Sequence, residues 1–114
     1  MILALTGGTG FVGGALIEQA LAAGHPVRAL ARRPQPPRDG VTWIAGALDD
    51  AAAISALVST ADAVVHVAGA VNAPDRAAFA AANIHGTRNV VDAARTWDVR
   101  RFVHVSSLAA REPA

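Results

Sequence analysis

The glycine-rich segment near the N-terminus constrains the fold of this chain more than any other feature: Leu5-Thr6-Gly7-Gly8-Thr9-Gly10-Phe11-Val12-Gly13-Gly14. A short apolar run, residues 1–5, precedes the glycines, and residues 15–23 follow them with apolar side chains at helical spacing. This order predicts a buried strand, a tight turn and a helix. Spaced glycines in that context are typical of a dinucleotide-binding turn, although the same spacing by itself also occurs in ordinary loops.

Three of these glycines have the spacing G-x-x-G-x-x-G, and each has a predicted role. Gly7 allows the tight turn, Gly10 lets a diphosphate approach the backbone, and Gly13 lets the helix lie close to the sheet. Backbone N–H groups at the positive end of the helix dipole then form an anion site. We therefore predict a dinucleotide contact from Gly7, Thr9, Gly10, Phe11, Val12 and Gly13.

The rest of the chain alternates between predicted strands and helices. Strands are expected at residues 27–31, 41–45, 63–67 and 101–105, with helices from about residue 11, over 50–59 and over 74–97. Right-handed crossovers then predict an α/β fold, a Rossmann-like doubly wound parallel sheet with strand order 3-2-1-4-5 that ends after strand five. We expect one domain over residues 1–114, with the first helix on one face and the later two on the other.

Two segments depart from a regular pattern. The prolines of residues 34–40 predict an exposed loop where such folds often have a helix. The long helix has Phe79, Ile84, Val90 and Val91 as predicted core contacts, but Gly86 interrupts it at a cost of about 1 kcal/mol. Either a close packing partner or a bend at Asn83 would explain that glycine.

Composition narrows the function classes. The chain is 53% hydrophobic with a net charge of only +1, which suits a buried parallel sheet and gives no indication of a nucleic-acid partner. No apolar run approaches the roughly 20 residues of a membrane span, and the N-terminus does not resemble a signal peptide, so a cytoplasmic location is expected. The 4 histidines have no metal-ligand spacing, so no metal site is predicted.

Two further segments are predicted to contact a bound dinucleotide. Arg32 and Arg33 stand about 20 residues beyond the glycines, where an acidic residue would hold the ribose 2′-hydroxyl of NAD. Arginine there suits the 2′-phosphate of NADP, so we predict NADP as cofactor with NAD possible; two solvated surface arginines are the alternative. Ala68, Gly69 and Ala70 are small enough to leave room for a nicotinamide ribose, although a plain turn would look the same.

Four segments occur in an order that resembles a known family: Thr6 to Gly13, Asp62 to Gly69, Asn83 to Val90, and Val105-Ser106-Ser107. The chain resembles the NAD(P)-dependent epimerase/dehydratase branch of the short-chain dehydrogenase/reductase superfamily, in its N-terminal portion only. Within that branch it looks closest to atypical members similar to a respiratory complex I accessory subunit.

The resemblance implies roles for single residues. The glycine loop would bind the pyrophosphate, and Asn83 would help to organise a proton relay. Ser107, rather than Ser106, would hydrogen-bond the substrate oxygen. The family often has Asp where this chain has Ala47, so we expect the adenine to rely on backbone near Leu48.

The family also has a Tyr-x-x-x-Lys pair that follows the serine, and this chain contains no Tyr and no Lys. The Tyr would act as general acid and base, with the Lys charge lowering its pKa. The expected function is therefore the NAD(P)-binding domain of an oxidoreductase that is catalytically incomplete as given, with a small-molecule substrate only in a longer parent. The alternative is a non-catalytic nucleotide-binding sensor or assembly module.

The predicted helix count leaves one sheet face with a single covering helix. Apolar side chains of residues 64–67 and 102–105 that point to that face are expected to lie open, and strand five becomes an edge. We therefore expect a poorly stable or self-associating chain, which makes a homo-oligomer possible.

Overall fold

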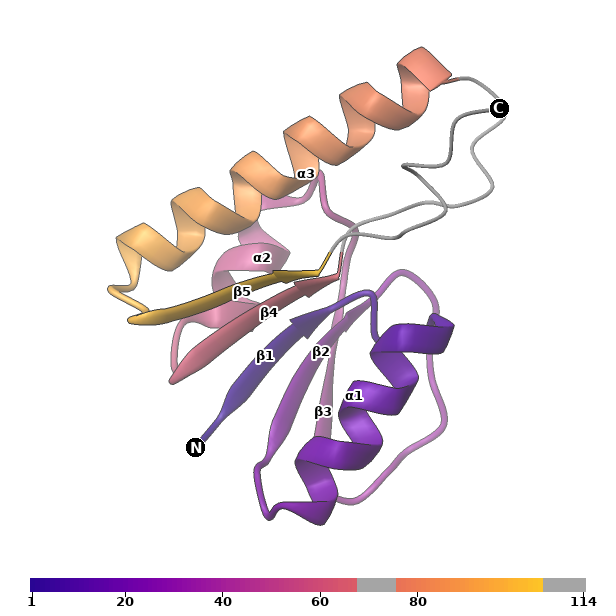
Figure 1. The fold of residues 1–114 in the computed structure, drawn as a ribbon, viewed down its shortest axis with the longest axis vertical. Coiled ribbons are helices and arrows are strands. Elements are labelled where there is room, and N and C mark those ends of the chain that lie inside the picture. The colour runs from indigo at the N-terminus through magenta and orange to yellow at the C-terminus, as the bar shows by residue number, and fades with distance from the viewer. Residues whose placement is uncertain (68–75, 106–114) are drawn as a thin grey trace.

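The computed structural model describes residues 1–67 and 76–105, and within residues 76–83 it describes the backbone only. Five strands and three helices alternate along the chain (Figure 1). They are β1 (Leu3–Thr6), α1 (Phe11–Ala22), β2 (Val27–Ala31), β3 (Val41–Ala45), α2 (Ala51–Val58), β4 (Ala63–Val67), α3 (Arg76–Thr96) and β5 (Arg101–Val105).

The strands form one sheet with the order β3-β2-β1-β4-β5. Each neighbouring pair is parallel, with Leu5 of β1 opposite Ala29 of β2 and opposite Val65 of β4. The predicted topology is confirmed. The chain leaves β1 toward β2 on one side and later returns to β4 on the other, so the carboxyl end of β1 lies at the topological switch point of the sheet.

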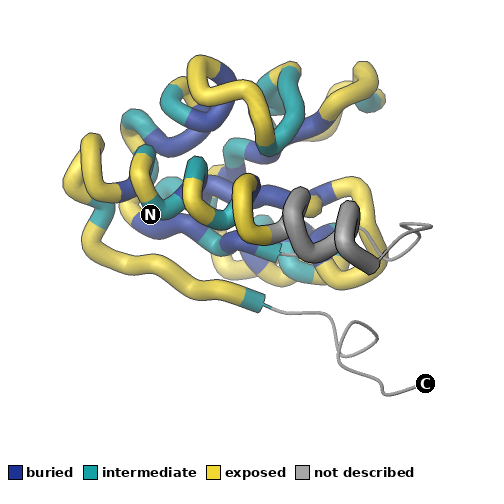
Figure 2. Tube along the Cα trace, turned by 90° about the horizontal axis from the view of Figure 1, so that it is seen from above, coloured by how far each residue is buried: buried dark blue, intermediate teal, exposed yellow. Residues whose placement is uncertain are grey.

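The helices cover the two faces of this sheet unequally (Figure 1). α1 packs over one face, and α2 and α3 lie over the other, as right-handed crossovers require. The segment 34–40 joins β2 to β3 without a helix, which confirms the predicted loop. Buried positions gather in the central strands β1, β2 and β4 and on the helix sides that face them, while the edge strands β3 and β5 have no buried residue (Figure 2).

Two apolar clusters hold the layers together, one on each face. The cluster on the α2–α3 face contains Ala4, Leu30, Ala53, Ile54, Leu57, Val58, Val64, Val90 and Ala94. The cluster on the α1 face contains Leu5, Ile17, Ala20, Val27 and Ala29. Because parallel strands with helices on both faces bury both sets of side chains, β1 and β2 are apolar at nearly every position.

The core contacts of α3 match the prediction only in part. Val90 is buried and Val91 is half-buried, but Ile84 is 61% exposed, so its prediction as a core residue is wrong. The buried stripe of the helix passes through Gly86, Val90 and Ala94, and Ile84 lies about 200° around the axis from Gly86. Phe79 belongs to the part of α3 whose side chains are not described.

Candidate functional site

The glycine loop between β1 and α1 is built so tightly that side chains are excluded at two of its positions. Gly7 has a φ of 73°, and a Cβ there would lie 2.9 Å from the carbonyl oxygen of Val67 in β4. A Cβ on Gly13 would lie 1.9 Å from the carbonyl oxygen of Gly7. The sequence predicts that Gly13 lets the helix approach the sheet, and in the structure its nearest contacts are with the Gly7 and Gly8 backbone of the loop.

The N-terminus of α1 leaves its backbone donors available. The first helical hydrogen bond runs from the Gly14 N–H to the Gly10 carbonyl at 2.9 Å, so the N–H groups of Phe11, Val12 and Gly13 precede it. Gly10 is the N-cap and makes no side-chain capping bond, and the first turn holds no acidic residue. Uncapped donors at the positive end of a helix fit an anionic diphosphate.

Gly10 and its neighbours also leave room for such a ligand. Among the residues that the structure describes, a Cβ on Gly10 would meet only the Gly7 carbonyl oxygen, at 3.5 Å, and Thr9, Phe11 and Val12 are exposed. The loop residues predicted from the sequence therefore lie together around one accessible backbone surface, and their contact with a dinucleotide stays a prediction.

The other predicted cofactor residues follow the carboxyl ends of neighbouring strands. Arg32 and Arg33 come directly after β2 and are exposed, and Leu48 follows β3 by three residues. Parallel strands bring these positions to the same sheet edge as the glycine loop. Ala68, Gly69, Ala70 and Ser107 lie outside the described residues, and of Asn83 only the backbone, within α3, is described.

The loop that contains Leu48 is held by α3. The Asn89 side-chain amide donates to the Leu48 carbonyl at 2.7 Å, and a Cβ on Gly86 would lie 3.0 Å from Leu48 Cδ1. Leu48 is thus the close packing partner that accounts for Gly86. Sequence reasoning assigned no role to Asn89, and its place three residues after Gly86 in the quoted motif was the available signal.

A buried polar chain ties the glycine loop to α3. The Thr6 hydroxyl lies 2.7 Å from His66 Nδ1 and accepts from the Val67 N–H at 3.1 Å, while His66 Nε2 lies 2.9 Å from the Thr87 hydroxyl. The His66 ring stacks on that of His104 in β5, with centroids 5.1 Å apart. Thr6 directly precedes Gly7, so these hydrogen bonds fix the point where β1 enters the glycine loop.

His66 is uncharged at neutral pH. Burial, and secondly the neighbouring His104, lower the pKa of His66 from its ordinary 6.5 to about 4. A neutral imidazole has one donor and one acceptor nitrogen, which suits a position between two hydroxyl groups. The structure thus gives His66 a structural role between β1 and α3.

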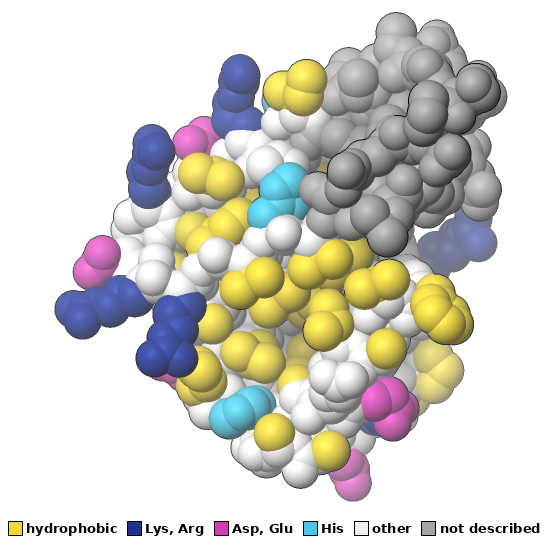
Figure 3. Space-filling view, in the orientation of Figure 1, with side chains coloured by type: hydrophobic (Ala, Val, Ile, Leu, Met, Phe, Trp, Pro, Cys, Tyr) yellow, Lys and Arg dark blue, Asp and Glu magenta, His cyan; other side chains and the backbone are white. Residues whose placement is uncertain are grey.

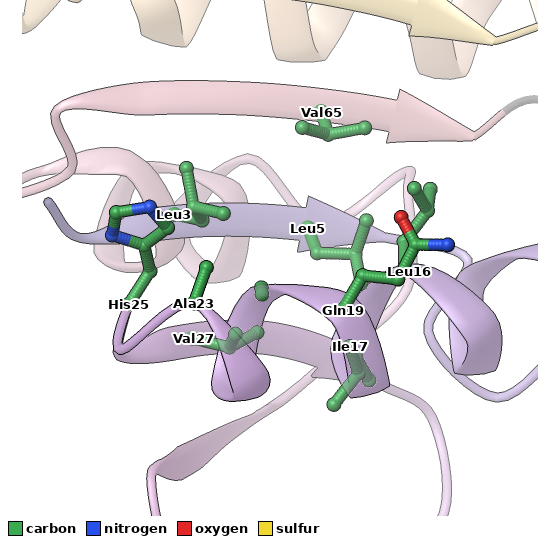
Figure 4. A pocket seen from close by; sticks show the side chains of 10 residues that line it. Leu3, Leu5, Leu16, Ile17, Gln19, Ala23, His25, Val27 and Val65 are labelled. Carbon is green, nitrogen blue, oxygen red and sulfur yellow. The ribbon is translucent and has the colours of Figure 1, made fainter.

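A separate apolar groove lies on the α1 face, away from the glycine loop. It has a volume of about 250 Å³, and its lining includes Leu3, Leu5, Leu16, Ile17 and Val65 (Figure 4). Apolar side chains gather over the same part of the surface (Figure 3). The lining lacks the backbone donors that a diphosphate needs, so this groove is not the candidate nucleotide site.

Two other kinds of feature are absent from the described part of the chain. Residues 1–67 and 76–105 hold no group of three or more side chains that could ligate a metal ion. Over the same residues, no helix is both long and apolar enough to cross a bilayer.

Comparison with known proteins places this geometry in context. The model of the NAD dependent epimerase/dehydratase family matches residues 3–112. Ceramide reductase of Caulobacter vibrioides is 39% identical over 117 residues, an alignment that covers 99% of this chain and 37% of that protein.

Solved structures similar to this chain include proteins with bound NAD. A short-chain dehydrogenase/reductase superfamily protein from Agrobacterium tumefaciens with bound NAD is 37% identical, with a TM-score of 0.79 over 94% of this chain and 33% of that one. The Bordetella bronchiseptica enzyme WbmG in complex with NAD is 34% identical, with a TM-score of 0.78 over 91% of this chain and 36% of the enzyme. The chain spans about a third of the length of these relatives.

Proposed function

The chain belongs to the NAD-dependent epimerase/dehydratase family, and from that premise we propose that it is the cofactor-binding part of an oxidoreductase or epimerase that prefers NADP. Its fold is the Rossmann-like dinucleotide-binding fold of short-chain dehydrogenases/reductases, and two similar structures contain NAD. The narrower likeness to a complex I accessory subunit stays a prediction.

The glycine loop is the observation that carries this proposal. Its two crowded glycines bring the uncapped first turn of α1 to the switch point of the sheet, where doubly wound folds bind nucleotides. The N–H groups of Phe11 and Val12 would donate to the pyrophosphate, and Thr9 and Gly10 would border it. Ala68, Gly69 and Ala70 remain proposed neighbours of the nicotinamide ribose.

The choice of NADP rests on Arg32 and Arg33. Both are exposed at the carboxyl edge of the sheet, just beyond β2, where a guanidinium reaches a 2′-phosphate in bidentate fashion. NADPH is therefore expected to bind at least about tenfold more tightly than NADH, since a hydrogen bond to a charged group is worth about 1.5–3 kcal/mol and about 1.4 kcal/mol corresponds to tenfold. Calorimetric titration of the purified chain with both cofactors measures this preference.

A pair of variants separates a specific contact from general charge attraction. Arg32→Asp should abolish the preference for NADPH, because a carboxylate repels the 2′-phosphate and accepts from a 2′-hydroxyl. Arg100→Asp makes the same charge change just before β5, at the opposite edge of the sheet, and should leave the preference intact. Equal affinities of the unmutated chain for NADH and NADPH would overturn the assignment.

Catalysis would need residues that these 114 positions do not contain. A bound nicotinamide would supply or accept hydride, Ser107 would hold the substrate oxygen and Asn83 would support the proton relay, as in the family. Because the sequence has no Tyr and no Lys, the general acid and base of the family has no counterpart in it. The alternative is nucleotide binding by a non-catalytic sensor or assembly module, and a Tyr-x-x-x-Lys pair in a longer parent would exclude it.

Turnover assays with alcohols and nucleotide sugars distinguish activity in residues 1–114 from binding alone. We expect no cofactor-dependent turnover above the buffer blank. Turnover that disappears in Ser107→Ala would instead show that these residues suffice for chemistry and would remove the non-catalytic candidate. A cytoplasmic location is also part of the proposal, and cell fractionation tests it.

A further inference from the structure

We propose that Thr87 of α3 positions the glycine loop for the dinucleotide through the ring of His66. This inference rests on the proposed function, because it concerns how tightly the glycine loop binds a diphosphate. The role of the half-buried Thr87 is indirect, since its hydroxyl group acts through His66 and Thr6. Thr87 is therefore a positioning residue.

The first step in the argument is the direction of the hydrogen bonds at Thr6. The Thr6 hydroxyl oxygen accepts from the Val67 N–H at 3.1 Å. The hydroxyl hydrogen needs an acceptor of its own, because Thr6 is only 1% exposed and buried polar groups are almost always paired. Among residues 1–67 and 76–105, the acceptor within reach of this hydroxyl is His66 Nδ1, at 2.7 Å. Thr6 therefore donates to His66.

This direction determines the tautomer of His66. The ring is uncharged at neutral pH, so an Nδ1 atom that accepts leaves the hydrogen on Nε2. The Nε2–H group then donates to the Thr87 hydroxyl oxygen, 2.9 Å away. In the other tautomer Nδ1 would carry the hydrogen, and the Thr6 hydroxyl hydrogen would lose its acceptor. The Thr87 oxygen thus stabilises the tautomer that Thr6 requires.

The second step leads from Thr6 to the anion site. Thr6 directly precedes Gly7, whose carbonyl accepts from the Gly10 N–H at 3.1 Å. The same carbonyl lies so close to α1 that a Cβ on Gly13 would be 1.9 Å from it. Loop and helix therefore meet at the Gly7 carbonyl. Because the contact leaves no free space, a rotation of the Thr6–Gly7 peptide would displace the first N–H groups of α1.

Loss of the Thr87 hydroxyl should therefore weaken cofactor binding, since a loop that is already ordered loses less entropy when it binds. Thr87→Val keeps the shape of the side chain but leaves the His66 Nε2–H group without an acceptor. The dissociation constant of the cofactor should rise about three- to tenfold, the range of one neutral hydrogen bond. Thr87→Ala also removes the hydroxyl group and should give a similar rise.

NMR titration of the isotope-labelled chain with NADP⁺ and with NAD⁺ at neutral pH measures these constants. Thr87→Ser restores the hydroxyl group and should return the constant to within about twofold of the unmutated value. Thr96→Val is the matched control, because it removes an exposed hydroxyl group of the same helix that donates to the Asp92 carbonyl at 2.9 Å. This control should leave the affinity unchanged.

NMR spectra of the His66 ring nitrogens provide a second readout, which does not depend on the affinity. In the unmutated chain the hydrogen should reside on Nε2 alone, and in Thr87→Val both tautomers should be populated. A hydrogen on Nδ1 in the unmutated chain would overturn the inference, even if the Thr87 variants failed to fold.

The outcomes separate this inference from the proposed function. An unmutated chain that binds neither NADP⁺ nor NAD⁺ overturns both. If the unmutated chain binds a cofactor and a folded Thr87→Val variant binds it equally well, only the positioning role is wrong. The positioning role is also wrong if Thr87→Ser binds as weakly as Thr87→Val, because the hydroxyl group would then not be the part of Thr87 that matters.

Discussion

The two faces of the sheet are closed to different degrees, and β4 shows the difference within one strand. On the face covered by α2 and α3, Val64 and His66 are 0% and 1% exposed. On the face covered by α1, the alternating residues Val65 and Val67 are only partly buried. All but His66 are valines, so the number of helices on each face, rather than the strand sequence, decides how well a position is buried.

At the edge strand β5 the difference between the faces disappears. Phe102 points to the α2–α3 face and is 36% exposed, while Val103 points to the α1 face and is 52% exposed. The sequence predicted open side chains toward α1, which Val103 confirms. The exposure of Phe102 follows from the position of α3, which packs against α2 and β4. The sheet is therefore well covered at its centre and open at β5.

The largest expected effect tests how completely the α2–α3 face excludes water. The pKa of His66 is about 4 in the folded chain against 6.5 for an ordinary histidine, so the unfolded chain takes up a proton first as the pH falls. The contribution of uncharged His66 to the free energy of unfolding is therefore complete above pH 6.5 and is lost progressively down to about pH 4. The loss should reach about 3 kcal/mol, at 1.36 kcal/mol for each pH unit.

Urea unfolding at a series of pH values measures this slope. His66→Gln keeps hydrogen-bonding groups but does not titrate, and the difference between the two curves removes the contribution of carboxylates. If the free energy of unfolding falls with pH equally in the variant and the unmutated chain between pH 6.5 and 4, His66 is not desolvated. Water would then reach the face that α2 and α3 cover.

The next effect compares two valines on neighbouring strands and opposite faces. Val64→Ala removes two methyl groups from a fully buried site and should cost about 2 kcal/mol, because the transfer free energy is lost and a cavity remains. Val103→Ala removes the same groups from an exposed site and should stay within about 0.5 kcal/mol. Chemical denaturation measures both, and similar costs would contradict the contrast between the covered centre of the sheet and its open edge at β5.

The third effect concerns association through the open face. Val103, in the edge strand β5, is 52% exposed and lies beside Val65, which lines the groove on the α1 face. A second copy of the chain could cover both the groove and the strand edge. We expect self-association at micromolar concentrations, and Val103→Glu should shift light scattering toward the monomer. Ile84→Glu changes an apolar residue on α3 that is even more exposed, at 61%, and should leave the scattering unchanged.

A monodisperse monomer over the whole concentration range would argue against this association. A cooperative melt of that monomer near 45–65 °C, as is usual for mesophile domains, would also remove the expectation of poor stability.

The smallest expected change in stability comes from removing an ion pair at the surface of the α1 face. Arg38, in the loop that replaces a helix, donates to Glu18 of α1 at 2.6 Å, with side chains 40% and 68% exposed. An exposed ion pair of this kind contributes roughly 0–1 kcal/mol and is screened by salt. Glu18→Gln should therefore lower stability by no more than about 0.5 kcal/mol. A larger loss would mean that this loop helps to close the α1 face.

Local patterns in the sequence were enough to predict the strands, the helices and their order. β2, β3, β4 and β5 have the predicted bounds, because apolar runs between turn residues define parallel strands. Alternating strands and helices with right-handed crossovers then leave few topologies, and the observed one was predicted. Glycine spacing likewise predicted the tight turn at Gly7, where φ is 73°, and close packing of the helix at Gly13.

Only the tertiary structure decided which side chains hold the site in place. Asn89 meets Leu48 across 41 residues, and Thr6 meets His66 across 60, and neither pairing has a local pattern that would reveal it. The same holds for Ile84, which is apolar but faces away from the sheet. A helix pattern predicts a buried stripe, but the rotation of the helix about its axis depends on close contacts such as the one between Gly86 and Leu48, which form only when distant segments pack.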